Sequence, residues 1–181
     1  VFSTDMLGFF KASLENYRTV LFEDKYPKYL LNSVITSLAT VVITVPIGST
    51  AGYAFARLKM KRKDSWFFMI LTTRMAPAVT FAVPIYILMV SLGLIDNIVG
   101  LIAIYVFSNL ALCIWLTRSF FEDVPKEVEE AAMVDGAGIG RVMFQIVLPL
   151  SLPIIAVITL WSAIGHWNAW FDAMLYNRAN D

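Results

Sequence analysis

The sequence predicts an all-α fold, a polytopic transmembrane helical bundle in a single domain over 1–181, and two observations carry that prediction. Hydrophobic residues make up 59% of the chain and its mean hydropathy is +0.70, whereas soluble domains hold roughly 45–50% apolar residues. Apolar stretches long enough to cross a bilayer, which takes about 20 residues, alternate with short polar connections. We therefore expect about four membrane crossings, at 29–56, 65–90, 98–117 and 150–171.

Charge and cysteine content argue against several other classes of protein. Lys+Arg and Asp+Glu balance at 14 each, which favours neither nucleic acid nor a strongly acidic partner. The single cysteine, Cys113, lies in an apolar run, so the sequence offers no internal disulfide and no metal or redox motif. We therefore expect no metal, no cofactor and no binding of nucleic acid.

The first two segments differ in pattern. The 1–28 stretch is mixed and aromatic, with apolar positions spaced for one face of an amphipathic helix. In the crossing at 29–56, Gly48, Gly52 and Ala56 recur every four residues, a spacing that lets another helix approach closely. We interpret these three small residues as a helix-packing stripe and not as contacts to a ligand.

Charges in the connections predict which way the crossings run. A dense basic loop follows the first crossing and is expected in the cytoplasm, because Lys and Arg favour that side. Its residues are Arg57, Lys59, Lys61, Arg62 and Lys63. The connection at 91–97 has no Lys or Arg and carries Asp96, so it is expected to face outward. The crossing at 98–117 then returns the chain to the cytoplasm.

One charged residue, Arg74, falls inside the crossing at 65–90. Counting about 1.5 Å per residue from Ser65 puts it roughly 14 Å deep, near the middle of a hydrocarbon core about 30 Å thick. A lone charge there is costly, so Arg74 is expected to face protein or water and is a candidate for a solute pathway. The alternative is that Arg74 caps carbonyls left free where Pro77 and Pro84 break the helix.

The polar stretch at 118–149 has the pattern of two short helices joined by a turn. Pro125 suits the first turn of a helix, and the acidic residues that follow lie where the helix dipole favours anions. Gly136 and Gly138 allow a sharp turn, and Gly136 is expected to have a positive φ. A second helical run at 139–147 leads into the last crossing. We expect a helix-turn-helix elbow at the cytoplasmic surface.

This elbow carries a motif with many fixed positions. Its residues, in order, are Glu130, Ala131, Ala132, Gly136, Ile146, Leu148 and Pro149. At these spacings the chain resembles the EAA motif of the membrane-spanning subunits of ABC importers. Flanking runs resemble the carbohydrate-uptake branch of that family, namely Phe120-Phe121, Val124-Pro125-Lys126-Glu127, Asp135-Gly136-Ala137 and Leu148-Pro149-Leu150.

The resemblance implies a fold of the ABC importer permease type, with the elbow as a coupling helix seated in a cleft of a separate ATPase. It implies ATPase-coupling roles for Glu130, Ala131, Ala132, Asp135, Gly136 and Ala137. The implied partners are ABC ATPase subunits, a second permease subunit or a copy of this chain, an extracytoplasmic solute-binding protein and the lipid bilayer. The implied solute is a sugar or related polyol.

The resemblance also sets expectations for location and chemistry. It implies a multi-pass protein of the plasma or inner membrane of a prokaryote, with 1–28 outside the cytoplasm. It further implies a first and a last helix that this stretch lacks. The sequence has no Gly-x-x-x-x-Gly-Lys-Ser/Thr loop, so we expect ATP hydrolysis to belong to a partner and this chain not to be an enzyme.

Aromatic and polar residues gather in the outer half of the last crossing. Together with Arg74 they form the candidate substrate pathway, which consists of Trp161, His166, Trp167, Asn168 and Trp170. Trp rings stack on the C–H faces of sugars, and Asn and His bind hydroxyls. Trp167 and Trp170, three residues apart, are expected to share a helix face. The alternative is an aromatic belt at the membrane–water interface.

Two other functions account for less of the sequence. An ion-gradient-driven secondary transporter or channel would need polar residues paired across several crossings, whereas only Arg74 and His166 stand out. An intramembrane enzyme built on His166 and Asp172 would lack a shared helix face for that pair and a second His for a metal site.

Overall fold

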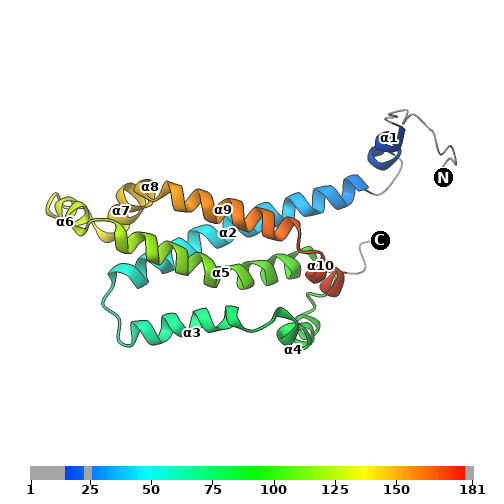
Figure 1. Ribbon diagram of the computed structural model, residues 1–181, viewed down its shortest axis with the longest axis horizontal. Helices are drawn as coiled ribbons and strands as arrows, with labels where there is room; N and C mark the ends of the chain where they lie inside the picture. The colour runs from blue at the N-terminus through cyan, green and yellow to red at the C-terminus, as the bar shows by residue number, and fades with distance from the viewer. Residues whose placement is uncertain (1–14, 23–25, 178–181) are drawn as a thin grey trace, which may run out of the picture.

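The computed structural model describes residues 15–22 and 26–177, and these residues form helices and short connections without a strand (Figure 1). Residues 1–14, 23–25 and 178–181 lie outside the described residues, and with them most of the expected amphipathic segment. In chain order the elements are α1 (Glu15–Phe22), α2 (Tyr26–Arg57), α3 (Lys63–Met75), α4 (Ala78–Ser91), α5 (Ile98–Asp123), α6 (Lys126–Val134), α7 (Ile139–Val142), the π-helix η1 (Met143–Val147), α8 (Leu148–Leu150), α9 (Leu152–Trp167) and α10 (Trp170–Tyr176).

Three helices, α2, α5 and α9, pack against one another and form the centre of the bundle, while α3 packs on α5 and α4 contacts α10 (Figure 1). Within the described residues, α2 and α5 are each long and apolar enough to cross a membrane alone. Two bent helix pairs bring the number of possible spans to four if each pair counts as one. An all-α bundle of apolar helices is therefore confirmed.

Glycines allow α2 and α5 to come very close. A Cβ placed on Gly48 would overlap the side chain of Cys113, and one placed on Gly52 would overlap that of Thr117. The two helices also meet through Thr117 Oγ1, which lies 3.2 Å from the carbonyl oxygen of Gly48. Ala56, one turn further along α2, packs on a buried cluster beneath the elbow. The stripe of small residues thus lies where helices meet.

The expected crossing at 65–90 is not one helix, because α3 and α4 are bent by 99° at their junction. Ala76 is extended at ψ 140°, and Pro77 caps the start of α4. Proline disfavours helical geometry in the residue before it, which explains why α3 ends at Met75. Pro84, also expected to break the segment, lies inside α4 without ending it.

The expected crossing at 150–171 is interrupted as well. Ile139–Leu150 and Leu152–Trp167 are bent by 77° at Ser151, where a helix that began with the elbow turns into the bundle. Helix α9 then ends at Trp167, and α10 follows after a turn at 168–169. The stretch 150–171 is therefore not one continuous helix, and whether it forms one crossing stays a prediction.

Helix α5 is longer than expected. It continues past Thr117 to Asp123, so the first residues of the polar 118–149 stretch belong to this long helix. In this extension Arg118 Nε donates to Glu122 Oε1 at 2.9 Å, a favourable pair one helical turn apart. The elbow itself begins only at Pro125, the N-cap of α6.

Candidate functional site

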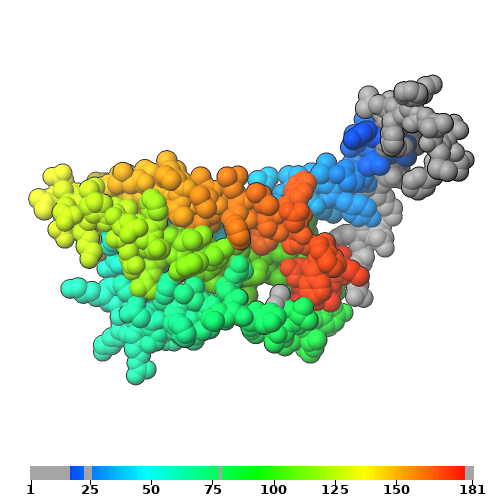
Figure 2. Space-filling view, in the orientation of Figure 1, coloured from blue at the N-terminus to red at the C-terminus, as the bar shows by residue number. Residues whose placement is uncertain are grey.

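The elbow formed by α6 and α7 lies at one end of the bundle, far from α10 at the other end (Figures 1 and 2). Its turn is closed by backbone hydrogen bonds from Gly136 to Met133 and from Ala137 to Ala132, each 3.0 Å long. Gly136 has φ +87°, in the left-handed region that glycine adopts without strain. The expected positive φ at Gly136 is confirmed.

The structure divides the motif residues of the elbow into two groups. Glu130, Ala131, Asp135 and Gly136 are exposed at its surface. Ala132 and Ala137 are half-buried instead and pack against a core cluster beneath the elbow. That core cluster consists of Tyr53, Phe121, Val142, Met143 and Val147. The elbow therefore offers a small acidic surface on a well-packed base.

A buried ion pair, which the sequence reasoning missed, joins the elbow to α2. Arg57 Nε donates to Glu129 Oε1 at 2.6 Å, and their side chains are only 9% and 5% exposed. The other carboxylate oxygen, Oε2, accepts the Tyr53 hydroxyl at 2.9 Å. Arg57 was expected to be part of a basic cytoplasmic loop, but its side chain is buried because Glu129 and the carbonyl oxygen of Val124 accept its hydrogen bonds. The sequence hinted at this burial only through the spacing of Glu129 and Ala132, which are three residues apart and therefore lie on the same face of α6, the face that packs on the bundle.

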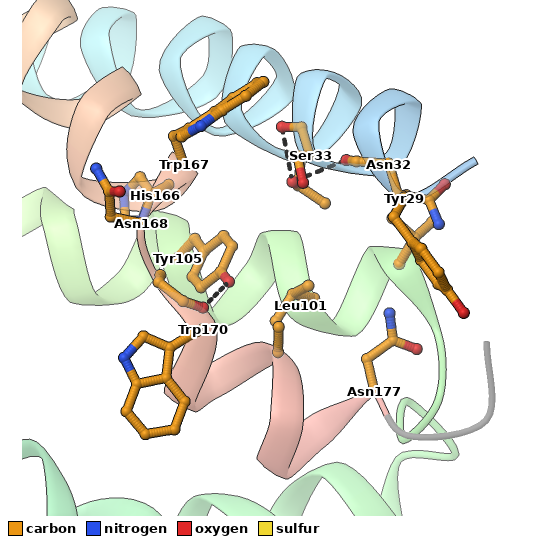
Figure 3. Close-up of a pocket in the computed structure, with 14 residues that line it drawn as sticks. Tyr29, Asn32, Ser33, Leu101, Tyr105, His166, Trp167, Asn168, Trp170 and Asn177 are labelled. Atoms are coloured by element: carbon orange, nitrogen blue, oxygen red, sulfur yellow. Dashed lines mark hydrogen bonds between the residues drawn. The ribbon is translucent and has the colours of Figure 1, made fainter. Parts of the chain in front are cut away.

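The second candidate site is a cavity of about 510 Å³ at the opposite end of the bundle (Figure 3). The start of α2 forms one wall and the junction of α9 with α10 forms another. Its polar and aromatic lining includes Tyr29, Asn32, Tyr105, His166, Trp167, Asn168, Trp170 and Asn177. Among the described residues that line it, none is an Asp, Glu, Lys or Arg.

Several of these side chains are held in place by neighbours. The rings of Tyr105 and His166 stack with centroids 4.6 Å apart and planes inclined by 21°. The Tyr105 hydroxyl donates to the carbonyl oxygen of Ala169 at 2.9 Å (Figure 3). Asn168 Nδ2 donates to the carbonyl oxygen of Ile164 at 2.8 Å, so this amide caps the end of α9 and leaves its oxygen for another partner.

Four of the six candidate pathway residues line the cavity, namely His166, Trp167, Asn168 and Trp170. Trp167 and Trp170 were expected to share a helix face. They do not, because α9 ends at Trp167 and Trp170 begins α10. Figure 3 shows Trp167 extending toward α2 and Trp170 pointing away from it. Trp161 lies on the exposed face of α9 and does not line the cavity.

Arg74 is likewise absent from the cavity lining. Its Nη1 donates to the carbonyl oxygen of Ser108 in α5 at 2.9 Å. Arg74 therefore does bind a backbone carbonyl, but that carbonyl belongs to α5 and not to the segment that Pro77 interrupts. Sequence reasoning also missed the α2 wall, because Tyr29 and Asn32 open an apolar crossing far away in sequence. A polar face could have been predicted there, because polar residues recur at helical spacing at positions 29, 32, 33 and 36.

The described residues form an apolar helical bundle with a polar elbow at one end and a cavity lined by aromatic and polar side chains at the other, an architecture typical of a membrane transport subunit. The chain belongs to the family of binding-protein-dependent transport system inner membrane components, whose model matches residues 44–171. The resemblance drawn from the EAA motif is thereby confirmed.

Individual relatives agree with this family. The chain is 33% identical to the maltodextrin transport system permease protein MdxG of Bacillus subtilis, covering 83% of this chain and 54% of that protein. It is 32% identical to the trehalose/maltose transport system permease protein MalG of Thermococcus litoralis, covering 92% and 61%. A crystal structure of a bacterial ABC transporter involved in import of the acidic polysaccharide alginate matches with TM-score 0.81 and 31% identity, covering 90% and 57%. The chain thus spans little more than half the length of these three relatives.

Proposed function

We propose that this chain is a membrane-spanning subunit of an ATP-driven importer and forms half of a pathway for a sugar or related polyol. The observation that carries this proposal is the EAA-type elbow, with Glu130 and Gly136 exposed on a rigid base at one end of the bundle. Such a surface suits docking into a separate ATPase, which would supply the energy. The names of the relatives, which concern maltodextrin and trehalose/maltose, support a carbohydrate as the solute.

Within the elbow, the exposed residues would contact the ATPase and the half-buried residues would hold the elbow on the bundle. Glu130 and Asp135 offer carboxylates to basic residues in the ATPase cleft, and Ala131 adds no bulk that would keep the surfaces apart. Gly136 permits the turn at φ +87°, and Ala132 and Ala137 seat the elbow on its core cluster. The remaining partners in this proposal are a second permease subunit and an extracytoplasmic binding protein.

At the other end, the cavity is the proposed place of solute contact. The Trp167 ring is 49% exposed and can stack on the C–H face of a sugar ring. The free carbonyl oxygen of Asn168 can accept a hydrogen bond from a hydroxyl group. Support for this assignment is that both groups face one cavity whose described lining includes no Asp, Glu, Lys or Arg, which suits a polyhydroxylated solute.

The test is uptake by proteoliposomes that hold the assembled complex of this subunit with its partner permease, ATPase subunits and binding protein. ATP-dependent uptake is expected for at least one member of a panel of oligosaccharides and polyols. Glu130→Lys should lower uptake while leaving membrane insertion intact, because it would place like charges together in the cleft. Glu127→Lys, exposed on the same helix but outside the motif, is the matched control. Wild-type uptake by the Glu130→Lys complex would refute the coupling role.

The same assay separates an importer from an ion-gradient-driven transporter or channel. A gradient-driven protein would continue uptake without ATP and would stop when an ionophore collapses the gradient. An ATP-driven importer is expected to show the reverse.

A further inference from the structure

Three helices meet at a single guanidinium group where the elbow joins the bundle. Arg57, in the last turn of α2, uses Nε to bind Glu129 of α6 at 2.6 Å. Its Nη2 donates to the carbonyl oxygen of Val124 at 2.7 Å. Val124 is the C-cap that follows α5, and it has extended backbone at ψ 126° before α6 begins. One side chain therefore holds both the corner between α5 and α6 and the body of α6.

The carboxylate of Glu129 is satisfied on both sides, by Arg57 on Oε1 and by the Tyr53 hydroxyl on Oε2. Tyr53 is itself buried and packs edge-on against Phe121, with ring centroids 6.1 Å apart. Burying two charges is expensive, and well-packed apolar residues often stabilise a protein as much as a buried ion pair does. What a planar guanidinium adds is direction, because its hydrogen bonds fix the angle at which its partners lie.

The ion pairs that Arg118 makes near the elbow are not buried on both sides. Arg118 pairs with Asp64 at 3.1 Å and with Glu122 at 2.9 Å, but the acidic partners are 85% and 44% exposed. Exposed pairs of this kind contribute little to stability. Among the ion pairs of the described residues, only that of Arg57 and Glu129 is buried on both sides and joins the elbow to a long helix.

We propose that Arg57 and Glu129 are positioning residues for coupling, which lock the elbow to α2 and α5 so that a displacement of the elbow is transmitted to these helices. This inference rests on the proposed function, in which the exposed elbow surface docks on an ATPase. Glu129 faces the bundle, whereas the neighbouring Glu130 faces outward. The two adjacent glutamates thus have different tasks, since one anchors the elbow and the other meets the partner.

The test compares single and double substitutions in the assembled, reconstituted complex. Arg57→Gln and Glu129→Gln should each reduce the number of solute molecules transported per ATP by about tenfold, because a buried charge that loses its partner disturbs its surroundings far more than an exposed one does. Glu122→Gln, which breaks an exposed pair, is the control and should change the ratio by less than about twofold. Arg57→Lys keeps the charge but not the planar fork, so it should restore only part of the coupling.

The decisive variant replaces both partners and also removes the hydroxyl that Glu129 accepts, as Arg57→Met, Glu129→Leu and Tyr53→Phe. This apolar set should restore the thermal stability lost in the single variants, because no buried charge and no buried hydroxyl is left without a partner. It should not restore transport per ATP, because packing without directed hydrogen bonds lets the elbow tilt. Recovery of stability and coupling together would overturn the inference, and so would a normal transport ratio in both single variants. If the wild-type complex does not couple ATP hydrolysis to uptake at all, the proposed function fails first.

Discussion

At the elbow end, Phe121, Val142 and Val147 are fully buried around the buried pair of Arg57 and Glu129, whereas the cavity end keeps Trp170 71% exposed. At the elbow end, Ala132 and Ala137 pack the turn against this buried core. The cavity end combines aromatic rings with hydroxyl and amide groups, among them the Tyr105 hydroxyl and the Asn168 amide, which donate to backbone carbonyl oxygens.

The difference between the two ends follows from what each surface would do. An elbow that transmits force must not deform, so its base is built from interlocked apolar residues and a directed ion pair. A cavity that admits a solute must keep space and leave polar atoms available to it. Stability and recognition are therefore expected to respond to mutation at opposite ends of the molecule.

The largest effect on stability should come from Phe121→Ala. Phe121 is completely buried, and removing a buried aromatic ring costs roughly 3–5 kcal/mol of folding free energy. The counterpart at the cavity end is Trp170→Ala, which should lower stability by less than about 1 kcal/mol because its ring is mostly exposed. Thermal unfolding in detergent would measure both, and equal losses would contradict the contrast drawn between the ends.

The next effect concerns the turn of the elbow. Gly136→Val forces a β-branched residue to φ +87°, which adds about 1–2 kcal/mol of strain or more and should lower ATP-dependent uptake by roughly five- to thirtyfold. Gly138→Val is the matched control, because Gly138 has φ −73° and open space around its Cβ position. Equal uptake by the two variants would show that the left-handed turn is not what coupling needs.

A smaller effect is expected for solute contact. Trp167→Ala and Asn168→Ala should each raise the apparent KM for the solute by about three- to tenfold, since stacking and single hydrogen bonds contribute about 0.5–1.5 kcal/mol. Basal ATP hydrolysis should not change, because both residues lie far from the elbow. Trp161→Ala, outside the cavity, is the control. Lower expression with an unchanged KM would assign Trp167 to an interfacial belt instead.

The smallest effect should come from Arg74→Leu. Arg74 makes an exposed hydrogen bond to the carbonyl oxygen of Ser108, and losing it should cost about 1 kcal/mol or less. Arg74→Lys can still reach that carbonyl and should lose less. Thermal unfolding measures the change, and uptake tests the pathway role in parallel. A large drop in uptake at normal stability would return Arg74 to the solute pathway.

Much of the elbow was determined by local sequence. The position of its helices, the glycine turn and the positive φ of Gly136 all follow from residues within one short stretch, because propensity and turn geometry act over a few residues. The class of fold was equally determined, since the apolar length of a segment decides whether it can cross a bilayer. The EAA motif identified the family for the same reason, as a local pattern.

Only the tertiary structure decided which distant residues meet. The charge pattern predicts that Arg57 lies in a basic cytoplasmic loop, whereas the folded chain buries its side chain, because Glu129 and Val124 accept its hydrogen bonds. The cavity likewise needs the start of α2 beside the end of α9, a meeting that no local pattern encodes. Burial and partnership depend on which surfaces the helices present to one another, and periodicity reveals a face without revealing what covers it.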